Sequence, residues 1–187
     1  MSQVAEFDSV RGIDRFTPAL LQPLARGLQW INECMVVLGS VALLAASIIL
    51  TSSVVSRYVM KASTDWQDEA AVFCLVGASF LSAAFVQSVR GHIGIEAVAG
   101  LLPRRLDLVR QMLIDLLSLT FCTFFSWKSW ALFHEAWVDG QTTSSSWAPP
   151  LWIPYALMAA GMSLLALQIL IQLTARINAM SAKGDVT

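Results

Sequence analysis

Three long uncharged segments limit what this chain can become more than any other feature. They cover residues 34–56, 70–89 and 142–175. Each is long enough for the roughly 20 apolar residues that cross the hydrocarbon core of a bilayer. The composition agrees, because 56% of residues are hydrophobic, 13% are charged and the net charge is −1. These values exclude a soluble domain and a nucleic-acid-binding protein, and they indicate an integral membrane protein.

A fourth membrane span is expected within residues 106–137, although this region is less apolar. Only residues 116–127 are free of charge, with Asp115 and Lys128 at the edges. At a rise of about 1.5 Å per residue, a helix over 109–130 would still cross the bilayer. Asp115 would then lie near one headgroup layer or face a neighbouring helix. The predicted fold class is an all-α integral membrane protein with four transmembrane helices.

The two ends of the chain are predicted to lie outside the membrane. We expect a cytoplasmic or interfacial segment at 1–27, a four-span membrane domain at 28–175 and a cytoplasmic tail at 176–187. The first apolar run begins too late, after too many charges, for a cleaved signal peptide, so the N-terminus is expected to be retained. An interfacial helix leading into the first span is predicted from the apolar side chains that share one helical face: Leu20, Leu21, Leu24, Leu28 and Ile31. The alternative is a polar extension of the first span.

The distribution of basic residues predicts the orientation. In a four-span protein, nine of the twelve Lys and Arg fall on one side of the membrane: Arg11, Arg15, Arg26, Arg90, Arg104, Arg105, Arg110, Arg176 and Lys183. Arg57, Lys61 and Lys128 fall on the other side. Because cytoplasmic connections carry the excess of positive charge, both termini are expected in the cytoplasm.

The sequence gives no sign of a catalytic or cofactor site. Cys34, Cys74 and Cys122 are far apart and form no C-x-x-C pair, so we interpret them as small packing residues. His92 and His134 lie near span ends, where they are poorly placed to hold haem iron. No metal cluster, nucleophile or phosphate-binding loop stands out. We expect no cofactor, no metal and no enzymatic activity, and the lack of ionisable groups in the middle of three spans argues against a transport path within this chain alone.

The segment "STDWQDE" at residues 63–69 places three carboxylates in front of the second span. Asp65, Asp68 and Glu69 would lie in or beside the first helical turn, where the helix dipole favours negative charge. The spacing of Thr64 and Gln67 predicts a capping box. An ion pair of Arg57 with Asp68 or Glu69, closing the first hairpin, is the more specific hypothesis. The alternative is that the acids only start the helix and help to anchor it.

The order of several motifs resembles that in the small membrane subunit of TRAP (tripartite ATP-independent periplasmic) transporters. The matching elements, spread over residues 57–161, are Arg57-Tyr58, Trp66-Gln67-Asp68-Glu69, His92-Ile93 after Arg90, Leu102-Pro103, and Pro150-Leu151-Trp152-Ile153-Pro154-Tyr155. The resemblance implies a multi-pass protein of the bacterial inner membrane that takes part in sodium-coupled import of an organic acid or similar small solute. The implied partners are a large polytopic transport subunit, whose scaffold this chain would brace, a periplasmic solute-binding protein and membrane lipids.

The resemblance also directs attention to three groups of residues. The expected structural and subunit-interface residues are Arg57, Trp66, Asp68 and Glu69 on the outer side, and His92, Ile93, Glu96 and Pro103 in an amphipathic cytoplasmic arm between spans two and three. The third group belongs to the hydroxyl-rich and proline-rich segment 139–152 and the start of the following span, expected to form a stiff docking loop for the binding protein: Ser145, Ser146, Pro150, Trp152 and Tyr155. A stand-alone four-span scaffold or sensor protein remains the alternative function.

Overall fold

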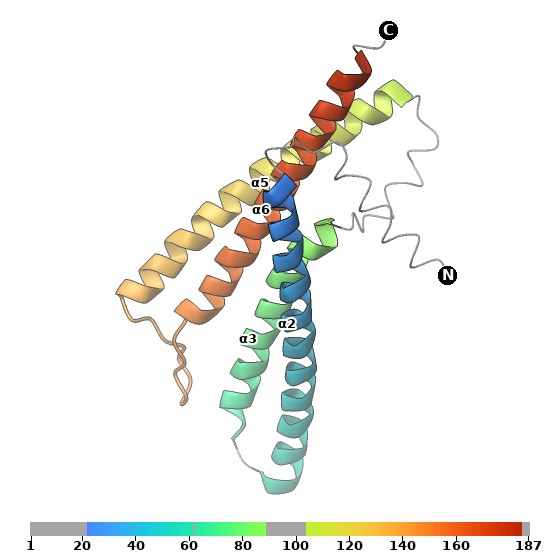
Figure 1. The fold of residues 1–187 in the computed structure, drawn as a ribbon. Helices are drawn as coiled ribbons and strands as arrows, with labels where there is room; N and C mark the ends of the chain where they lie inside the picture. The colour runs from blue at the N-terminus through green and yellow to red at the C-terminus, as the bar shows by residue number, and fades with distance from the viewer. Residues whose placement is uncertain (1–21, 62, 89–103, 185–187) are drawn as a thin grey trace, which may run out of the picture.

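The described residues form long helices. The computed structural model describes residues 22–61, 63–88 and 104–184 (Figure 1). The elements are α2 (Gln22–Val55), the π-helical turn η1 (Ser56–Met60), α3 (Asp65–Ser88), α5 (Arg104–Val138) and α6 (Trp152–Gly184). One isolated antiparallel bridge joins Thr142 to Pro150. The expected all-α fold is confirmed for this part of the chain.

Three of the described helices are long and apolar enough to cross a membrane. They are α2 with η1 (Ala25–Met60), α3 (Asp65–Ser88) and the first part of α6 (Trp152–Ala175). They correspond to the three uncharged segments, since charge is what such a helix must avoid. Helix α5 is 35 residues long but is not apolar enough to be counted with them. The four-span count therefore stays a prediction.

The helices pack in the order α2, α3, α6, α5. Helix α2 packs along α3, α3 against α6, and α6 along α5. Two antiparallel hairpins, α2/α3 and α5/α6, therefore meet through α3 and α6 (Figure 1). The middle of α6 supplies much of the buried core through Ala159, Met162 and Ile169, whereas α2 and α5 expose many large apolar side chains.

Close contact between the hairpins depends on a glycine. A Cβ atom built on Gly161 of α6 would lie 2.6 Å from the Phe80 carbonyl carbon and 2.9 Å from the Phe80 Cβ of α3. Only a residue without a side chain allows this approach, which is a common way for membrane helices to associate. On the other side of α3, a Cβ on Gly39 of α2 would lie 3.3 Å from the Ala78 carbonyl oxygen.

Side-chain amides connect helices that are distant in sequence. The Asn32 amide of α2 donates to Gln168 Oε1 of α6 at 3.1 Å, and Asn32 is fully buried. One turn along α6, the Gln172 amide donates to the Gln87 carbonyl at 3.0 Å and its Oε1 accepts from Gln87 Nε2 at 3.0 Å. Such hydrogen bonds between helices replace contacts with water that the bilayer does not provide.

Two side-chain contacts fix the register of α5 against α6. Trp137 near the end of α5 packs on Trp152 at the start of α6, with ring centroids 5.0 Å apart. The hydroxyls of Ser126 and Ser163 are 2.8 Å apart. Since α5 continues to Val138, Lys128 lies along the helix and not in a connection between helices. The assignment of Lys128 to the outer side together with Arg57 and Lys61 stays a prediction.

The N-terminal interfacial helix is not confirmed. Helix α2 is continuous from Gln22 into the first apolar segment, as the alternative of a polar extension requires. Residues 1–21 lie outside the described residues. So does 89–103, the region of the expected arm with His92, Ile93, Glu96 and Pro103. At the other end, α6 continues past the predicted boundary at 175 to Gly184.

Candidate functional site at the α2–α3 turn and the α5–α6 loop

The turn between α2 and α3 gathers the polar residues that the sequence singled out. The last turn of the first span widens into the π-helical turn η1, and Lys61 follows with a left-handed backbone (φ 53°). Helix α3 then begins as the Thr64 carbonyl accepts from the amides of Gln67 and Asp68 at 3.0 and 3.2 Å. This sharp reversal places Arg57 opposite the first turn of α3.

The expected ion pair is present and uses Asp68. Arg57 Nη2 lies 2.8 Å from Asp68 Oδ2. The second carboxylate oxygen, Oδ1, accepts from the Ser53 hydroxyl at 3.0 Å. The Arg57 guanidinium also donates to Thr64 Oγ1, at 2.7 Å from Nη2 and 3.2 Å from Nε. One arginine thus holds η1 both to Thr64, the residue before α3, and to the first turn of α3.

The predicted capping box is wrong. The Thr64 hydroxyl oxygen accepts from Arg57, and Gln67 Oε1 is buried without a hydrogen-bond partner, so Gln67 does not reach back to Thr64. The nearby arginine, which the local capping pattern does not take into account, is the stronger donor for that hydroxyl. The side-chain amide of Gln67 instead lies at the edge of an apolar surface.

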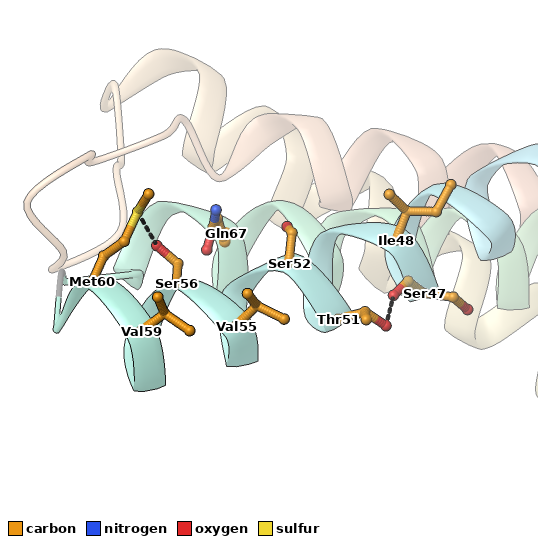
Figure 2. A pocket seen from close by; sticks show the side chains of 9 residues that line it. All are labelled: Ser47, Ile48, Thr51, Ser52, Val55, Ser56, Val59, Met60 and Gln67. Atoms are coloured by element: carbon orange, nitrogen blue, oxygen red, sulfur yellow. Dashed lines mark hydrogen bonds between the residues drawn. The ribbon is translucent and has the colours of Figure 1, made fainter.

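Gln67 also lines a groove of about 710 Å³ along α2 and η1 (Figure 2). Apart from Gln67, its lining side chains all come from one face of α2 and η1: Ser47, Ile48, Thr51, Ser52, Val55, Ser56, Val59 and Met60. The Ser47 and Thr51 hydroxyls donate to backbone carbonyls one turn earlier in the helix. The groove therefore has a mainly apolar surface on the outside of the hairpin.

A second set of contacts ties the α5–α6 loop to the start of α3. The Ser145 hydroxyl donates to Glu69 Oε2 at 2.7 Å. The rings of Trp66 and Trp147 meet edge to face, with centroids 6.3 Å apart. We call these two contacts the clasp. It joins the two hairpins at the same end of the molecule as the Arg57–Asp68 pair.

The loop that carries Ser145 has a defined backbone. Gly140 lies in the turn after α5 with φ +61°, which a residue without Cβ adopts easily. The next amide, of Gln141, donates to the Ala136 carbonyl at 3.1 Å. Two strand-like hydrogen bonds follow, from Thr143 N to the Pro149 carbonyl and from Leu151 N to the Gln141 carbonyl. The Ser145 hydroxyl oxygen also accepts from Ala148 N at 3.2 Å. The loop is therefore a short hairpin closed on itself.

The other predicted loop residues divide between the hairpin and α6. Ser146 is exposed at the tip, and Pro150 is half-buried at the bridge with Thr142. Trp152 opens α6 against Trp137, and Tyr155 lies half-buried in the first turn of that helix. The structure brings Ser145 to Glu69 and leaves the other four outside the clasp.

Comparison with known protein families matches the sequence of this chain to one family. The family described as "Tripartite ATP-independent periplasmic transporters, DctQ component" matches residues 46–179, which include the turn, the clasp and most of α6. The chain belongs to this family. It is a DctQ component, a membrane subunit of a transport system, and the resemblance found in the sequence is confirmed.

A curated relative supports the same assignment. The chain is 25% identical over 150 residues to "Isethionate TRAP transporter permease protein DctMQ" of Oleidesulfovibrio alaskensis (strain ATCC BAA-1058 / DSM 17464 / G20). The aligned region is 77% of this chain and 24% of that protein, so the DctQ component spans about a quarter of the relative's length. No solved structure matches the chain.

The contacts of this DctQ component suit structural joining of its helices. Each of the three acids accepts a hydrogen bond from within the chain: Asp65 from Ser63, Asp68 from Ser53 and Arg57, and Glu69 from Ser145. In the described residues, no three His, Cys, Asp or Glu side chains lie together as a metal site would require.

Sequence reasoning missed several partners in this site. Ser53 lies one helical turn before Arg57, and this spacing was the available signal that both face α3. Trp147 was visible only as one of the tryptophans of the loop, because nothing local points to Trp66. The amides Asn32 and Gln172 were also missed: both are polar residues in or beside apolar segments, but their pairing across helices depends on the tertiary fold.

Proposed function

We propose that this DctQ component is the small membrane subunit of a sodium-coupled, binding-protein-dependent importer, in which it braces the scaffold of a large transport subunit. The observation that carries the proposal is the clasp between Glu69 and Ser145. It closes the two hairpins at one end, while the Gly161–Phe80 contact joins them further along. A unit held at two levels suits a static support better than a moving part.

We propose a four-span arrangement with both termini in the cytoplasm of a bacterium and the clasp facing the periplasm. Helix α5 lies antiparallel along α6, whose apolar segment crosses the membrane, so α5 would cross at the same depth. The charge distribution supports the orientation: of the Lys and Arg in the described residues, Arg57 and Lys61 lie at the α2–α3 turn beside the clasp, and the sequence assigns nine others to the cytoplasmic side. Exposed apolar side chains of α2 are then available to membrane lipids.

The residues of the predicted cytoplasmic arm are also part of the proposal. His92, Ile93, Glu96 and Pro103 belong to the segment "RGHIGIEAVAGLLPRR", whose apolar and basic residues are typical of a helix in the cytoplasmic headgroup layer. There this arm would support the large subunit at the face opposite the clasp.

The tip of the α5–α6 loop is proposed as a docking point for the periplasmic solute-binding protein. Ser144, Ser146 and Trp147 are exposed there, while the hairpin beneath them is closed by its own hydrogen bonds. Replacing Ser144 and Ser146 by Asp should weaken the stimulation of uptake by the binding protein and leave the membrane complex assembled. Unchanged dependence on binding-protein concentration would remove this role. Ser63→Asp, at an exposed position of the other turn, is the matched control.

The solute is proposed to be a small organic anion. The name of the curated relative refers to isethionate, a sulfonate, and the family resemblance implies organic acids. Since the hydrogen-bonded polar side chains of the described helices bind either their own helix backbone, as Ser47 does, or a neighbouring helix, as Asn32 does, selectivity would belong to the large subunit and the binding protein.

The experiment that tests the proposal is affinity purification of the tagged chain from its native membranes in mild detergent. A polytopic membrane protein should co-purify in a fixed ratio, and the purified pair should bind the solute-loaded binding protein. Recovery of this chain alone, as a monomer or homodimer, would instead favour a stand-alone scaffold or sensor.

A further inference from the structure

Lys128 lies at an unexpected depth. The Ser126–Ser163 contact fixes the register of α5 on α6, and Ser163 is at the centre of the apolar segment Trp152–Ala175. Lys128 is two residues from Ser126. It is also nine residues from Trp137, or about 14 Å along the helix, nearly half the thickness of a bilayer core of about 30 Å. With α5 beside α6, this ammonium group would be near the middle of the membrane.

The surroundings of Lys128 within the chain are aromatic. Its Nζ lies 5.0 Å from the centre of the Trp127 ring and 5.9 Å from that of Phe124. Phe124 is one turn earlier in α5, so the side chain extends toward the start of the helix and away from the nearer membrane surface at Trp137. Within the described part of the chain, no carboxylate is paired with it.

The face of α5 that carries Lys128 is uncovered. Leu117, Phe121 and Phe124 precede Lys128 at helical spacing on that face, with exposed fractions of 73%, 62% and 55%. The opposite face, with Cys122 and Ser126, is buried against α6. An apolar stripe that ends in a positive charge near the middle of the membrane is a poor surface for lipid tails, because a charged side chain at this depth is costly unless it is paired.

Helix α2 offers the contrasting case. Its exposed side chains between Val37 and Val55 are apolar or hydroxyl-bearing, and the segment contains no charge. That surface of α2 is compatible with lipid. Helix α5, in contrast, is the one described helix that is not apolar enough to be counted as a membrane span.

We propose that the α5 face formed by Leu117, Phe121, Phe124 and Lys128 binds the large transport subunit, and that a carboxylate on a membrane helix of that subunit pairs with Lys128. The proposal rests on the proposed function and adds to it the helix that makes the contact and the chemistry of the partner group. The pair would fix the depth at which the two subunits meet, while the aromatic side chains supply the contact area.

The test is co-purification of the large subunit with variants of the tagged chain. Lys128→Met should lower its recovery by about tenfold or more, because the partner's carboxylate is left buried without its counter-charge. Lys128→Arg should retain most of the recovery. Lys61→Met, which removes another exposed lysine at the α2–α3 turn, is the matched control. The amount and melting temperature of each variant made without the large subunit separate loss of the contact from loss of folding.

A photo-crosslinking residue gives a second measurement on the unmutated lysine. Placed at Phe124, it should crosslink to the large subunit; placed at Val37, on the exposed face of α2, it should not. If the large subunit is recovered but crosslinks from Val37 only, or if Lys128→Met recovers it normally, the α5 interface is overturned and the proposed function stands. If the unmodified chain recovers no large subunit, the proposed function itself fails.

Discussion

Ser145 donates a hydrogen bond to Glu69 across 76 residues of sequence, at 2.7 Å. The two residues belong to different hairpins. This bond and the adjoining Trp66–Trp147 contact therefore hold together parts of the chain that are far apart in sequence. The start of a helix by itself would not need such a bond. The acids at the start of α3 therefore have a role in tertiary structure besides helix initiation.

The clasp should show measurable coupling. In a double-mutant cycle of Glu69→Ala and Ser145→Ala, the two changes should be non-additive by about 1 kcal/mol, the contribution of a partly buried hydrogen bond. Unfolding of the purified chain by SDS in mixed micelles provides the free energies. The pair Glu69→Ala with Ser146→Ala is the control and should be additive, because Ser146 is exposed at the loop tip.

Neutralising the acids should weaken assembly without changing sodium dependence. Asp68→Asn combined with Glu69→Gln removes the counter-charge of Arg57 and weakens both hydrogen-bonded contacts. Because the Arg57 and Asp68 side chains are 58% and 48% exposed, the ion pair itself should contribute less than about 1 kcal/mol. A modest fall in yield and melting temperature of the complex is expected, and the sodium concentration giving half-maximal uptake should stay the same.

The opposite pattern would contradict this interpretation. A double variant that assembles at normal yield but needs much more sodium would place the acids in the coupling site. Arg57→Lys is a useful companion, since it keeps the charge but removes the forked geometry that reaches both Thr64 and Asp68.

Much of this arrangement could be predicted from local sequence, for physical reasons. Uncharged length predicts the spans, and an arginine before an acidic helix start predicts the Arg57–Asp68 pair. The capping-box prediction was wrong because the hairpin brings Arg57, a stronger donor, to the Thr64 hydroxyl oxygen. The position of Lys128 along α6 could not be predicted either, because only the Ser126–Ser163 contact in the folded structure fixes the register of α5 on α6.

Gly161 should not tolerate a side chain. Gly161→Ala places a methyl group against the Phe80 backbone, which cannot move as a side-chain end could, so a loss of about 1–3 kcal/mol in stability is expected. The melting temperature of the purified chain reports it. Gly27→Ala is the control, since a Cβ there meets nothing within 4 Å. Equal stability of the two variants would show that α3 and α6 do not approach as described.

The proposed orientation can be tested with single cysteines in a background lacking the native three. Cysteine at Ser63 or Ser146, both exposed, should react with an impermeant maleimide in cells with a permeable outer membrane. Cysteine at Lys183 should react only after lysis. Thr64 is unsuitable for labelling because it is 3% exposed. Reaction at 183 in intact cells would invert the topology.

Solute uptake by proteoliposomes, reconstituted with the large subunit and the binding protein, with and without this chain, tests the central claim most directly. The account predicts sodium-driven accumulation of a small organic anion when all three are present. Omitting this chain should abolish accumulation, and adding the Glu69→Ala, Ser145→Ala double variant should restore it only in part. Full uptake without this chain would contradict a bracing role.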